Sequence, residues 1–231
     1  MSRGMSGAII SVFLLIFVIA AIIQKRKQRL AKKAQELSVG RVQLGFDAPQ
    51  TKGLRAEIEA AVRASDPTTS LGIWRLSQRV LDIIQRHLDG VRFAGFLEKT
   101  AMTPELGEGE FQRLANEARA FFDREVVRKD ASGLAETERN SKKANELTDE
   151  DGDFGIDENF VVTLVMAVRA GPLGLPPVIV NQADVVRALE VMVTMPAERH
   201  VGFEVIWTPA AESDILGRDE LLTAFPELAP L

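Results

Sequence analysis

The sequence predicts an α+β protein, in which a single N-terminal transmembrane helix is followed by a small, mainly antiparallel sheet packed by about four amphipathic helices. Residues 4–23 are apolar and uncharged, which matches the about 20 residues that cross a bilayer as a helix. Strand-like patterning lies at 41–46, 160–168 and 201–207. Apolar residues at helical spacing lie at 54–64, 70–88, 109–129 and 182–194.

A basic segment follows the apolar one directly. Its charged side chains are Lys25, Arg26, Lys27, Arg29, Lys32 and Lys33. Basic residues favour the cytoplasmic flank of a span, so we predict a protein of the cell (inner) membrane with its N-terminus outside and its soluble domain in the cytoplasm. The predicted organisation is an anchor at 1–24, a basic juxtamembrane helix at 25–38 and an α+β domain at 39–231.

A cleaved signal peptide is the alternative to a retained anchor. The apolar core of a signal peptide usually spans about 7–15 residues and follows the positive charge. Here the apolar run is longer and most of the charge comes after it, which favours the anchor. The basic residues set the topology, and they also predict attraction to anionic lipid at about 1 kcal/mol each.

The charge of the chain is unevenly distributed. Seven of the 28 Lys and Arg lie in residues 1–33, which have no acidic residue, so residues 34–231 carry 21 basic and 33 acidic residues, a net charge of −12. Phosphate contacts supply most nucleic-acid affinity, so we predict no nucleic-acid binding. The chain has no Cys, which excludes disulfides and thiolate nucleophiles, and no metal or cofactor motif is recognisable. The sequence does not specify an oligomeric state.

The domain begins with a strand and two helices. Val42, Leu44 and Phe46 share one face of the strand at 41–46. The helix at 54–64 ends at the Ser65-Asp66-Pro67 breaker, and Thr69 or Ser70 is the predicted N-cap of the helix at 70–88. The predicted apolar stripe of that second helix is Leu71, Trp74, Ser77, Val80, Leu81, Ile84 and Leu88.

Residues 91–103 show no clear pattern, and a third helix is predicted at 109–129. Its predicted core face is Phe111, Leu114, Ala115, Ala118, Phe121, Phe122 and Val126. A solvated linker follows at 129–158, with acidic residues that resemble a calcium loop starting at Asp149. Phe154 stands where that loop requires Gly and Phe160 where it requires Glu, which favours an acidic linker over a calcium site.

The C-terminal part predicts two further strands around a helix. Residues 160–168 are apolar on both faces, as in a central strand. Asn181 is the predicted N-cap of the helix at 182–194, with Asp184 completing a capping box. In the strand at 201–207, Trp207 faces one way and Glu204 the other. If the sheet is covered on both faces, Glu204 needs a partner such as an Arg, or a raised pKa.

Several segments of the domain resemble a known family. They are Phe111-Gln112-Arg113-Leu114, Glu117-Ala118-Arg119, Phe122-Asp123-Arg124-Glu125, Phe160-Val161-Val162-Thr163-Leu164, Leu175-Pro176-Pro177, Glu204-Val205-Ile206-Trp207-Thr208-Pro209, Asp214-Ile215-Leu216 and Phe225-Pro226-Glu227-Leu228. Together they resemble the domain of unknown function 1517 family over Gly40 to Leu231, a family common in cyanobacteria and chloroplasts and typically membrane-associated. The resemblance implies a membrane-linked α+β domain without established chemistry, and it transfers no catalytic residues.

The region from Glu204 to Asp214 is the best candidate site in the sequence. In a functional interpretation, Glu204, Thr208 and Asp214 line a polar pocket or a partner surface beside Trp207. In a structural interpretation, Trp207 belongs to the core, Thr208 and Pro209 end the strand, and Asp214 caps a turn. We favour the structural interpretation and predict no catalytic residue.

The leading functional hypothesis is a membrane-tethered, non-enzymatic interaction or regulatory domain that presents an acidic surface to a protein partner at the cytoplasmic face. One alternative is a membrane-anchored, hydrolase-like enzyme using Glu204, Asp214 and His200. Another is an anionic-lipid-sensing membrane protein that acts through its basic segment. A pocket with convergent carboxylates would favour the enzyme, and an exposed apolar patch would favour the protein partner.

Overall fold

The computed structural model describes residues 24, 31, 33–47, 53–66, 68–132, 159–209 and 216–231. Its elements are β1 (Leu37–Asp47), α2 (Leu54–Arg63), α3 (Ser70–Arg86), η2 (Leu88–Gly90), β2 (Val91–Met102), α4 (Pro104–Ser132), β3 (Asn159–Arg169), α6 (Gln182–Val193), η3 (Ala197–Arg199), β4 (His200–Thr208), α7 (Arg218–Ala224) and β5 (Ala229–Pro230). The strands form one antiparallel sheet in the order β4-β3-β1-β2-β5. The predicted α+β class is confirmed.

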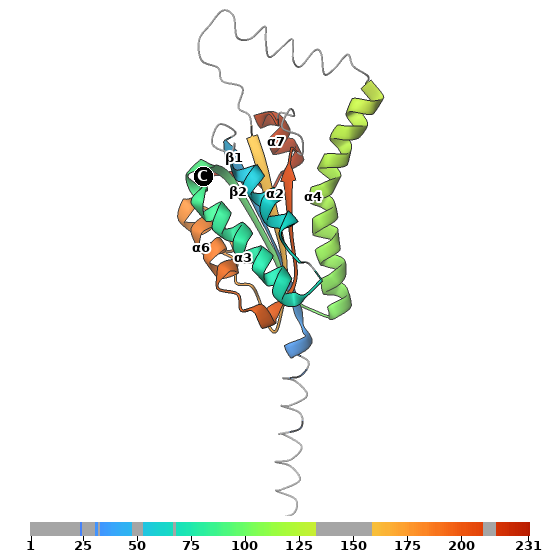
Figure 1. Cartoon of the computed structure of the whole chain (residues 1–231), viewed down its shortest axis with the longest axis vertical. Coiled ribbons are helices and arrows are strands. Elements are labelled where there is room, and N and C mark those ends of the chain that lie inside the picture. Colours follow the sequence, from blue (N-terminus) through green and yellow to red (C-terminus); the bar gives the residue numbers. More distant parts are fainter. Residues whose placement is uncertain are drawn as a thin grey trace, which may run out of the picture.

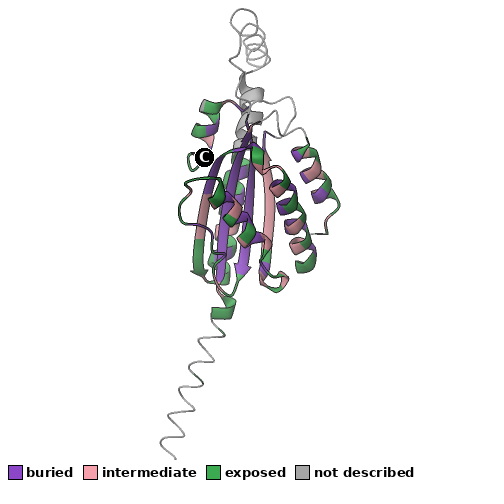
Figure 2. Ribbon diagram, turned by 90° about the vertical axis from the view of Figure 1, so that its left-hand side faces the viewer, coloured by how far each residue is buried: buried purple, intermediate pink, exposed green. Residues whose placement is uncertain are grey.

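Helices cover both faces of the sheet (Figure 1). α2, α3 and α6 pack on one face over the larger core, which takes Val42, Leu44 and Phe46 from β1. The predicted inward face of this strand is therefore confirmed. Figure 2 shows the consequence of this layering, because the central strands are buried while the strands at the edges are less so.

The second face carries two smaller apolar clusters separated by polar residues. Val39 and Val165 pack beneath Leu114 of α4. Further along the strands, Val161 packs beneath Leu221 of α7. The apolar residues of β3 thus serve both faces, as predicted for a central strand.

The predicted helices are present, with one correction to a buried face. Thr69 caps α3 by accepting a hydrogen bond from the Gly72 N–H (3.0 Å), and Asn181 and Asp184 form the predicted capping box of α6. Leu71 is 47% exposed, so its predicted place in the buried stripe is wrong. It lies in the first turn of α3. Ser77, Val80, Leu81 and Ile84 are buried as predicted, and Leu76 and Ile83 are buried in addition.

α4 begins earlier than the predicted residue 109. The chain turns into it directly from β2, with Thr103 Oγ1 accepting a hydrogen bond from the Leu106 N–H (3.4 Å). Leu114, Ala115 and Ala118 form its buried side, as predicted, with Phe111 packed against them. The predicted core residues Phe121, Phe122 and Val126 have side chains outside the description, and so does most of the predicted linker at 129–158.

The predicted anchor at 1–24 lies almost wholly outside the described part of the chain. Among the residues that the structure does describe, no helix combines the length and apolar character needed to cross a membrane. β1 begins at Leu37, so its first two residues overlap the predicted basic helix, which ends at residue 38. The sheet therefore starts directly after the predicted membrane-proximal segment.

Candidate functional site

The sequence-predicted site residues on β4 lie on two faces of the sheet. Glu204 pairs with Val165 and Thr208 with Val161, so both face α4 and α7. Trp207 pairs with Val162 and packs against the larger core on the other face. Thr208 is buried, and Asp214 lies outside the described ranges. The sheet thus separates Trp207 from the two polar residues.

Glu204 has the basic partner that its position required. Arg119 of α4 donates a hydrogen bond to Glu204 Oε1 and forms an ion pair with it. The side chain of Glu204 is 21% exposed, so the pair lies at the margin of the sheet rather than in its core. Of the two expectations for Glu204, a partner such as an Arg or a raised pKa, the structure shows the first, and the pair joins β4 to α4.

His200 does not join Glu204. It pairs with Val168, whose side chain belongs to the larger core, whereas Glu204 lies on the opposite face. His200 is 1% exposed, and neither ring nitrogen has a hydrogen-bond partner within the described ranges. Burial lowers its pKa, an effect partly offset by the Met195 carbonyl, which already accepts a hydrogen bond from Trp74 Nε1 at 3.1 Å. The acid–base pair considered for a hydrolase is therefore not formed.

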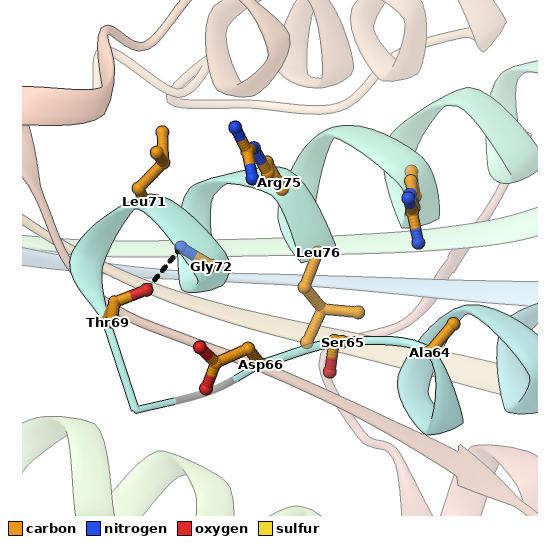
Figure 3. Close-up of a pocket in the computed structure, with 9 residues that line it drawn as sticks. Ala64, Ser65, Asp66, Thr69, Leu71, Gly72, Arg75 and Leu76 are labelled. Carbon is orange, nitrogen blue, oxygen red and sulfur yellow. Dashed lines mark hydrogen bonds between the residues drawn. The ribbon is translucent and has the colours of Figure 1, made fainter.

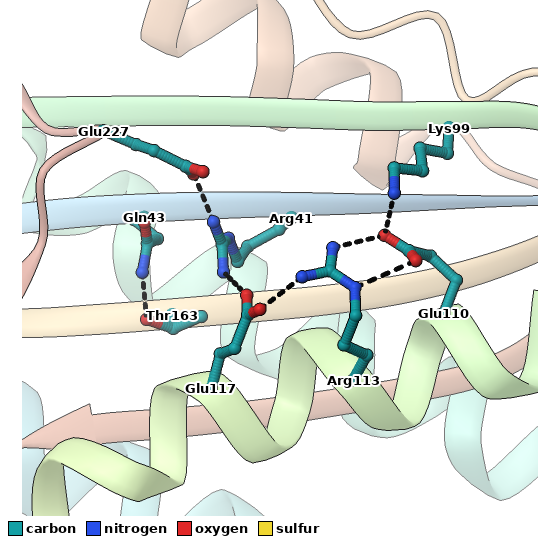
Figure 4. A network of polar contacts seen from close by, with 8 residues as sticks. All are labelled: Arg41, Gln43, Lys99, Glu110, Arg113, Glu117, Thr163 and Glu227. Atoms are coloured by element: carbon teal, nitrogen blue, oxygen red, sulfur yellow. Dashed lines mark hydrogen bonds and ion pairs between the residues drawn. The ribbon is translucent and has the colours of Figure 1, made fainter.

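A buried arginine organises the polar contacts on the face covered by α4. Arg41 of β1 donates to Glu117 of α4 through Nη1 (3.1 Å) and to Glu227 near the C-terminus through Nη2 (Figure 4). Its side chain is 7% exposed, whereas the two carboxylates are about half exposed. Beside it, Gln43 donates to Thr163 Oγ1 (3.3 Å). A buried charge is tolerated only when it is paired, and here the pairing holds α4 and the C-terminal segment to β1.

The network continues along α4 to its first turns. Arg113 bridges Glu117 and Glu110, and Lys99 of β2 donates to Glu110 at 3.0 Å (Figure 4). Hydrogen bonds from Arg113 and Lys99 lower the pKa of Glu110 to about 2. The network of Figure 4 thus contains Arg41, Lys99 and Arg113 against Glu110, Glu117 and Glu227, and its charges balance. Because these cations and carboxylates pair with one another, we interpret the network as a structural clamp that holds α4 and the C-terminal segment to the sheet.

A hollow of about 170 Å³ lies at the start of α3 (Figure 3). Its polar groups are already engaged, because Thr69 caps the helix and Asp66 accepts hydrogen bonds from the hydroxyl and N–H of Thr68. These bonds lower the pKa of Asp66. Arg75 and Arg79 line the hollow but are exposed to solvent. The hollow has no convergent catalytic groups.

A larger groove of about 390 Å³ runs between β2 and the loop that precedes α6. It is lined by Phe96, Leu97, Glu98, Thr100, Leu175, Pro176 and Pro177. Glu98 fixes the loop, because its carboxylate accepts hydrogen bonds from the N–H groups of Leu173 (2.6 Å), Gly174 (3.1 Å) and Leu175 (2.9 Å). Gly174 has φ +90°, a conformation that glycine adopts without strain.

An arginine holds the start of the same loop through hydrogen bonds to its backbone carbonyls. Arg199 of η3 donates to the carbonyls of Arg169, Gly171 and Pro172, each at 2.9 Å. On β1, Gly40 leaves the space that Leu175 fills, since a Cβ there would lie 2.9 Å from Leu175 Cδ1. The wall of the groove is therefore fixed before any partner binds.

Apolar side chains beyond the groove point to solvent. Val178 is 66% exposed and Val180 is 73% exposed. Val178 follows Pro177 directly and Val180 lies two residues further on, while Ile179 between them packs against the larger core. The loop therefore presents two exposed valines beside the groove. Exposed apolar residues that gather in one place are typical of binding surfaces.

Sequence reasoning missed Arg41 and Glu98. Both belong to strands, and their partners are far away in the chain, at separations of 76 and 186 residues for Arg41 and 75 to 77 for Glu98. A charge within a buried strand, such as Arg41 in β1, indicates that a partner is needed, but not which one. Within the described ranges, no group of three or more His, Asp or Glu residues is placed to hold a metal ion.

The chain matches a family described as "Protein of unknown function (DUF1517)" over residues 36–231. It belongs to this family. "FLUCTUATING-LIGHT-ACCLIMATION protein 1, chloroplastic" of Arabidopsis thaliana is 27% identical over 198 residues, covering 85% of this chain and 47% of that protein. "Protein FLAP1 homolog A" of Synechocystis is 24% identical over 198 residues, covering 86% of this chain and 58% of that protein.

The chain thus spans about half of the length of these two relatives. The match begins at residue 36, one residue before β1, so the shared part coincides with the α+β domain. No solved structure matches the chain significantly.

Proposed function

We propose that this protein is a membrane-tethered, non-enzymatic interaction domain that binds a protein partner at the cytoplasmic face of the membrane. The observation that carries the proposal is the exposed apolar segment around Val178 and Val180, beside a preformed groove. Exposing an apolar surface of this kind to water costs free energy, and that cost is removed when a partner covers the surface.

The tether rests on the sequence. Residues 4–23 are apolar, and the basic segment follows them before the sheet begins at Leu37. A domain so close to its anchor stays near the membrane surface, which raises the local concentration of any partner held there. The basic side chains add attraction to anionic lipid, which supports lipid contact as an accessory to the tether.

The nature of the described charged groups supports binding over catalysis. Glu204 is held by Arg119, and the network around Arg41 is charge-balanced. Catalytic carboxylates are usually placed where a substrate reaches them and their pKa is raised. One relative carries acclimation to fluctuating light in its name, and we propose that this chain likewise has a regulatory role.

Site-specific photo-crosslinking tests the proposal. p-Benzoylphenylalanine is introduced at Val178 in the full chain, expressed in its native membranes, and at Leu222 of α7 as the matched control. Leu222 is 40% exposed but belongs to the helix on the opposite face. We expect a discrete adduct with one protein from Val178 and none from Leu222. No adduct from Val178, or the same adducts from both positions, contradicts the proposed function.

A further inference from the structure

We propose that the partner binds as an extended segment that adds a strand to the outer edge of β2. This inference rests on the proposed interaction function and names the kind of partner. β2 runs from Val91 to Met102 and pairs with β1 along its length. On its other side it pairs only through Phe93 and Ala94, with the two-residue strand β5. The rest of this edge has no paired strand in the described part of the chain.

The register determines which backbone groups face outward. The Leu231 N–H donates to the Arg92 carbonyl (2.9 Å), so Arg92 directs its carbonyl toward the outer edge. Inward and outward groups alternate along an antiparallel strand, and the pairing with β1 runs without a shift from Phe93 to Lys99. The N–H and C=O groups of Phe96 and Glu98 therefore point outward. So does the N–H of Thr100, because it lies across a trans peptide bond from the carbonyl of Lys99, which faces β1.

The groove lies beside these same residues. Phe96, Glu98 and Thr100 line it together with Pro176 and Pro177 of the loop. A strand hydrogen-bonded to this edge would direct every second side chain toward the two prolines. The partner segment is therefore expected to alternate, with apolar residues facing the groove. Main-chain hydrogen bonds supply affinity in such complexes, and pockets for alternate side chains supply specificity.

The C-terminal segment of the chain itself is one possible occupant of this edge. This segment approaches β2 only at Gly95 and the residues before it. The Glu227 carbonyl oxygen would lie 2.8 Å from a Cβ on Gly95. The segment then runs through β5 toward Arg92, away from Thr100. It does not occupy the edge at Phe96 to Thr100.

A second copy of the chain fits this edge poorly. Antiparallel pairing of two β2 strands requires a two-fold axis perpendicular to the sheet. Such an axis directs the two β1 starts in opposite directions, and with them the two predicted anchors. Anchors in one membrane share one direction, so the geometry disfavours an antiparallel second copy, and we assign the edge to a segment of a different protein.

The test uses the Val178 crosslink in native membranes with two variants at one position. Thr100→Pro removes the outward N–H, at an edge position where proline is tolerated because that N–H is not paired within the sheet. Thr100→Val is the matched control, since it changes the exposed side chain and keeps the N–H. Thermal unfolding of both variants verifies that the fold is retained.

We expect Thr100→Pro to reduce the adduct by about tenfold, as for the loss of one well-placed hydrogen bond and the steric block that replaces it, and Thr100→Val to leave it unchanged. An adduct that persists in folded Thr100→Pro overturns strand addition while the proposed interaction function stands. An adduct whose mass is twice that of the chain also overturns it, in favour of a second copy. Absence of any adduct in the wild type refutes the interaction function itself.

Discussion

Arg41 is the most buried of the described arginine, lysine, aspartate and glutamate residues, and its ion pairs are asymmetric in exposure. The guanidinium is 7% exposed, while Glu117 and Glu227 are 45% and 44% exposed. When the arginine is removed, the two exposed carboxylates can be hydrated by solvent. When the carboxylates are removed, the buried guanidinium cannot be hydrated in the same way. The consequences of breaking the contact should therefore depend on which partner is removed.

Two variants test this asymmetry. Arg41→Met fills a similar volume and should cost about 1 kcal/mol of unfolding free energy, because the freed carboxylates become hydrated. The double variant Glu117→Gln and Glu227→Gln should cost about 3 kcal/mol, because it leaves a buried cation without a compensating charge. Urea unfolding at pH 7 measures both values. A larger loss for Arg41→Met would show that the arginine is held by contacts other than these two.

His200 predicts a pH dependence of stability. Burial lowers its pKa in the folded protein, so the folded state binds fewer protons than the unfolded state below about pH 6.5. The stability associated with neutral His200 is present above that pH and is lost as pH falls toward the folded pKa. His200→Leu should remove this component, making the unfolding free energy less dependent on pH between 7.5 and 5, where the slope from one group reaches at most about 1.4 kcal/mol per pH unit. Equal slopes for wild type and variant would refute the assignment.

Single residues were predictable from the sequence where the local pattern imposed a requirement. Glu204 stands on the opposite face from Trp207, and this predicted a partner such as an arginine, or a raised pKa, without identifying Arg119. The Asn181 and Asp184 capping box was readable because its parts are three residues apart. Arg41 was not predictable, because its partners come from a helix and from the C-terminal segment and only the fold brings them to β1.

At the scale of elements, long apolar runs and periodic helices were predicted and β2 was not. Gly95 interrupts the pattern of β2, and the structure shows why glycine is needed there: the Glu227 backbone approaches too closely for a Cβ. Beyond it, Glu98 and Lys99 weaken the apolar pattern because one binds a loop and the other binds Glu110. Residues that serve tertiary contacts thus interrupt the apolar and polar alternation by which a strand is recognised in a sequence.

Two helical glycines provide a matched test of packing at the ends of α3 and α4. A Cβ on Gly72 would lie 1.8 Å from the Asp66 carbonyl oxygen, whereas a Cβ on Gly109 would meet nothing within 4 Å. Gly72→Ala should therefore destabilise the domain by about 1–3 kcal/mol. Gly109→Ala should stabilise it by about 0.5–1 kcal/mol through reduced backbone freedom in the unfolded chain. Thermal unfolding measures both, and changes of the same sign would contradict the described packing.

The open edge of β2 predicts an alternating pattern of amide exchange. The N–H groups of Phe96 and Glu98 point outward, whereas that of Leu97 faces β1. In the free protein, hydrogen exchange followed by NMR should be fast at Phe96 and Glu98 and at least about a hundredfold slower at Leu97. Uniformly slow exchange at all three amides would mean that the edge is already paired.

At the scale of the whole molecule, a sheet clamped on both faces follows the segment that we propose leads to a membrane. The Arg41 network holds α4 and the C-terminal segment to the sheet, and Glu98 and Arg199 fix the loop beside the groove. A rigid domain pays little entropy on binding. Sequence reasoning predicted the α+β class, which is confirmed, while the anchor and the binding role stay predictions. The groove depends on the pairing of distant strands and loops, so only the structure revealed it.

The central claim is that a membrane anchor holds this domain on the cytoplasmic side. The chain has no Cys, so one cysteine introduced by Ser2→Cys or by Val178→Cys can be labelled selectively. In intact cells, a membrane-impermeant maleimide should label the Ser2→Cys protein and leave the Val178→Cys protein unlabelled until the membrane is permeabilised. Both proteins should remain with the membranes after an alkaline carbonate wash. Labelling of the Val178→Cys protein from outside, or release of either protein by the wash, would contradict the account.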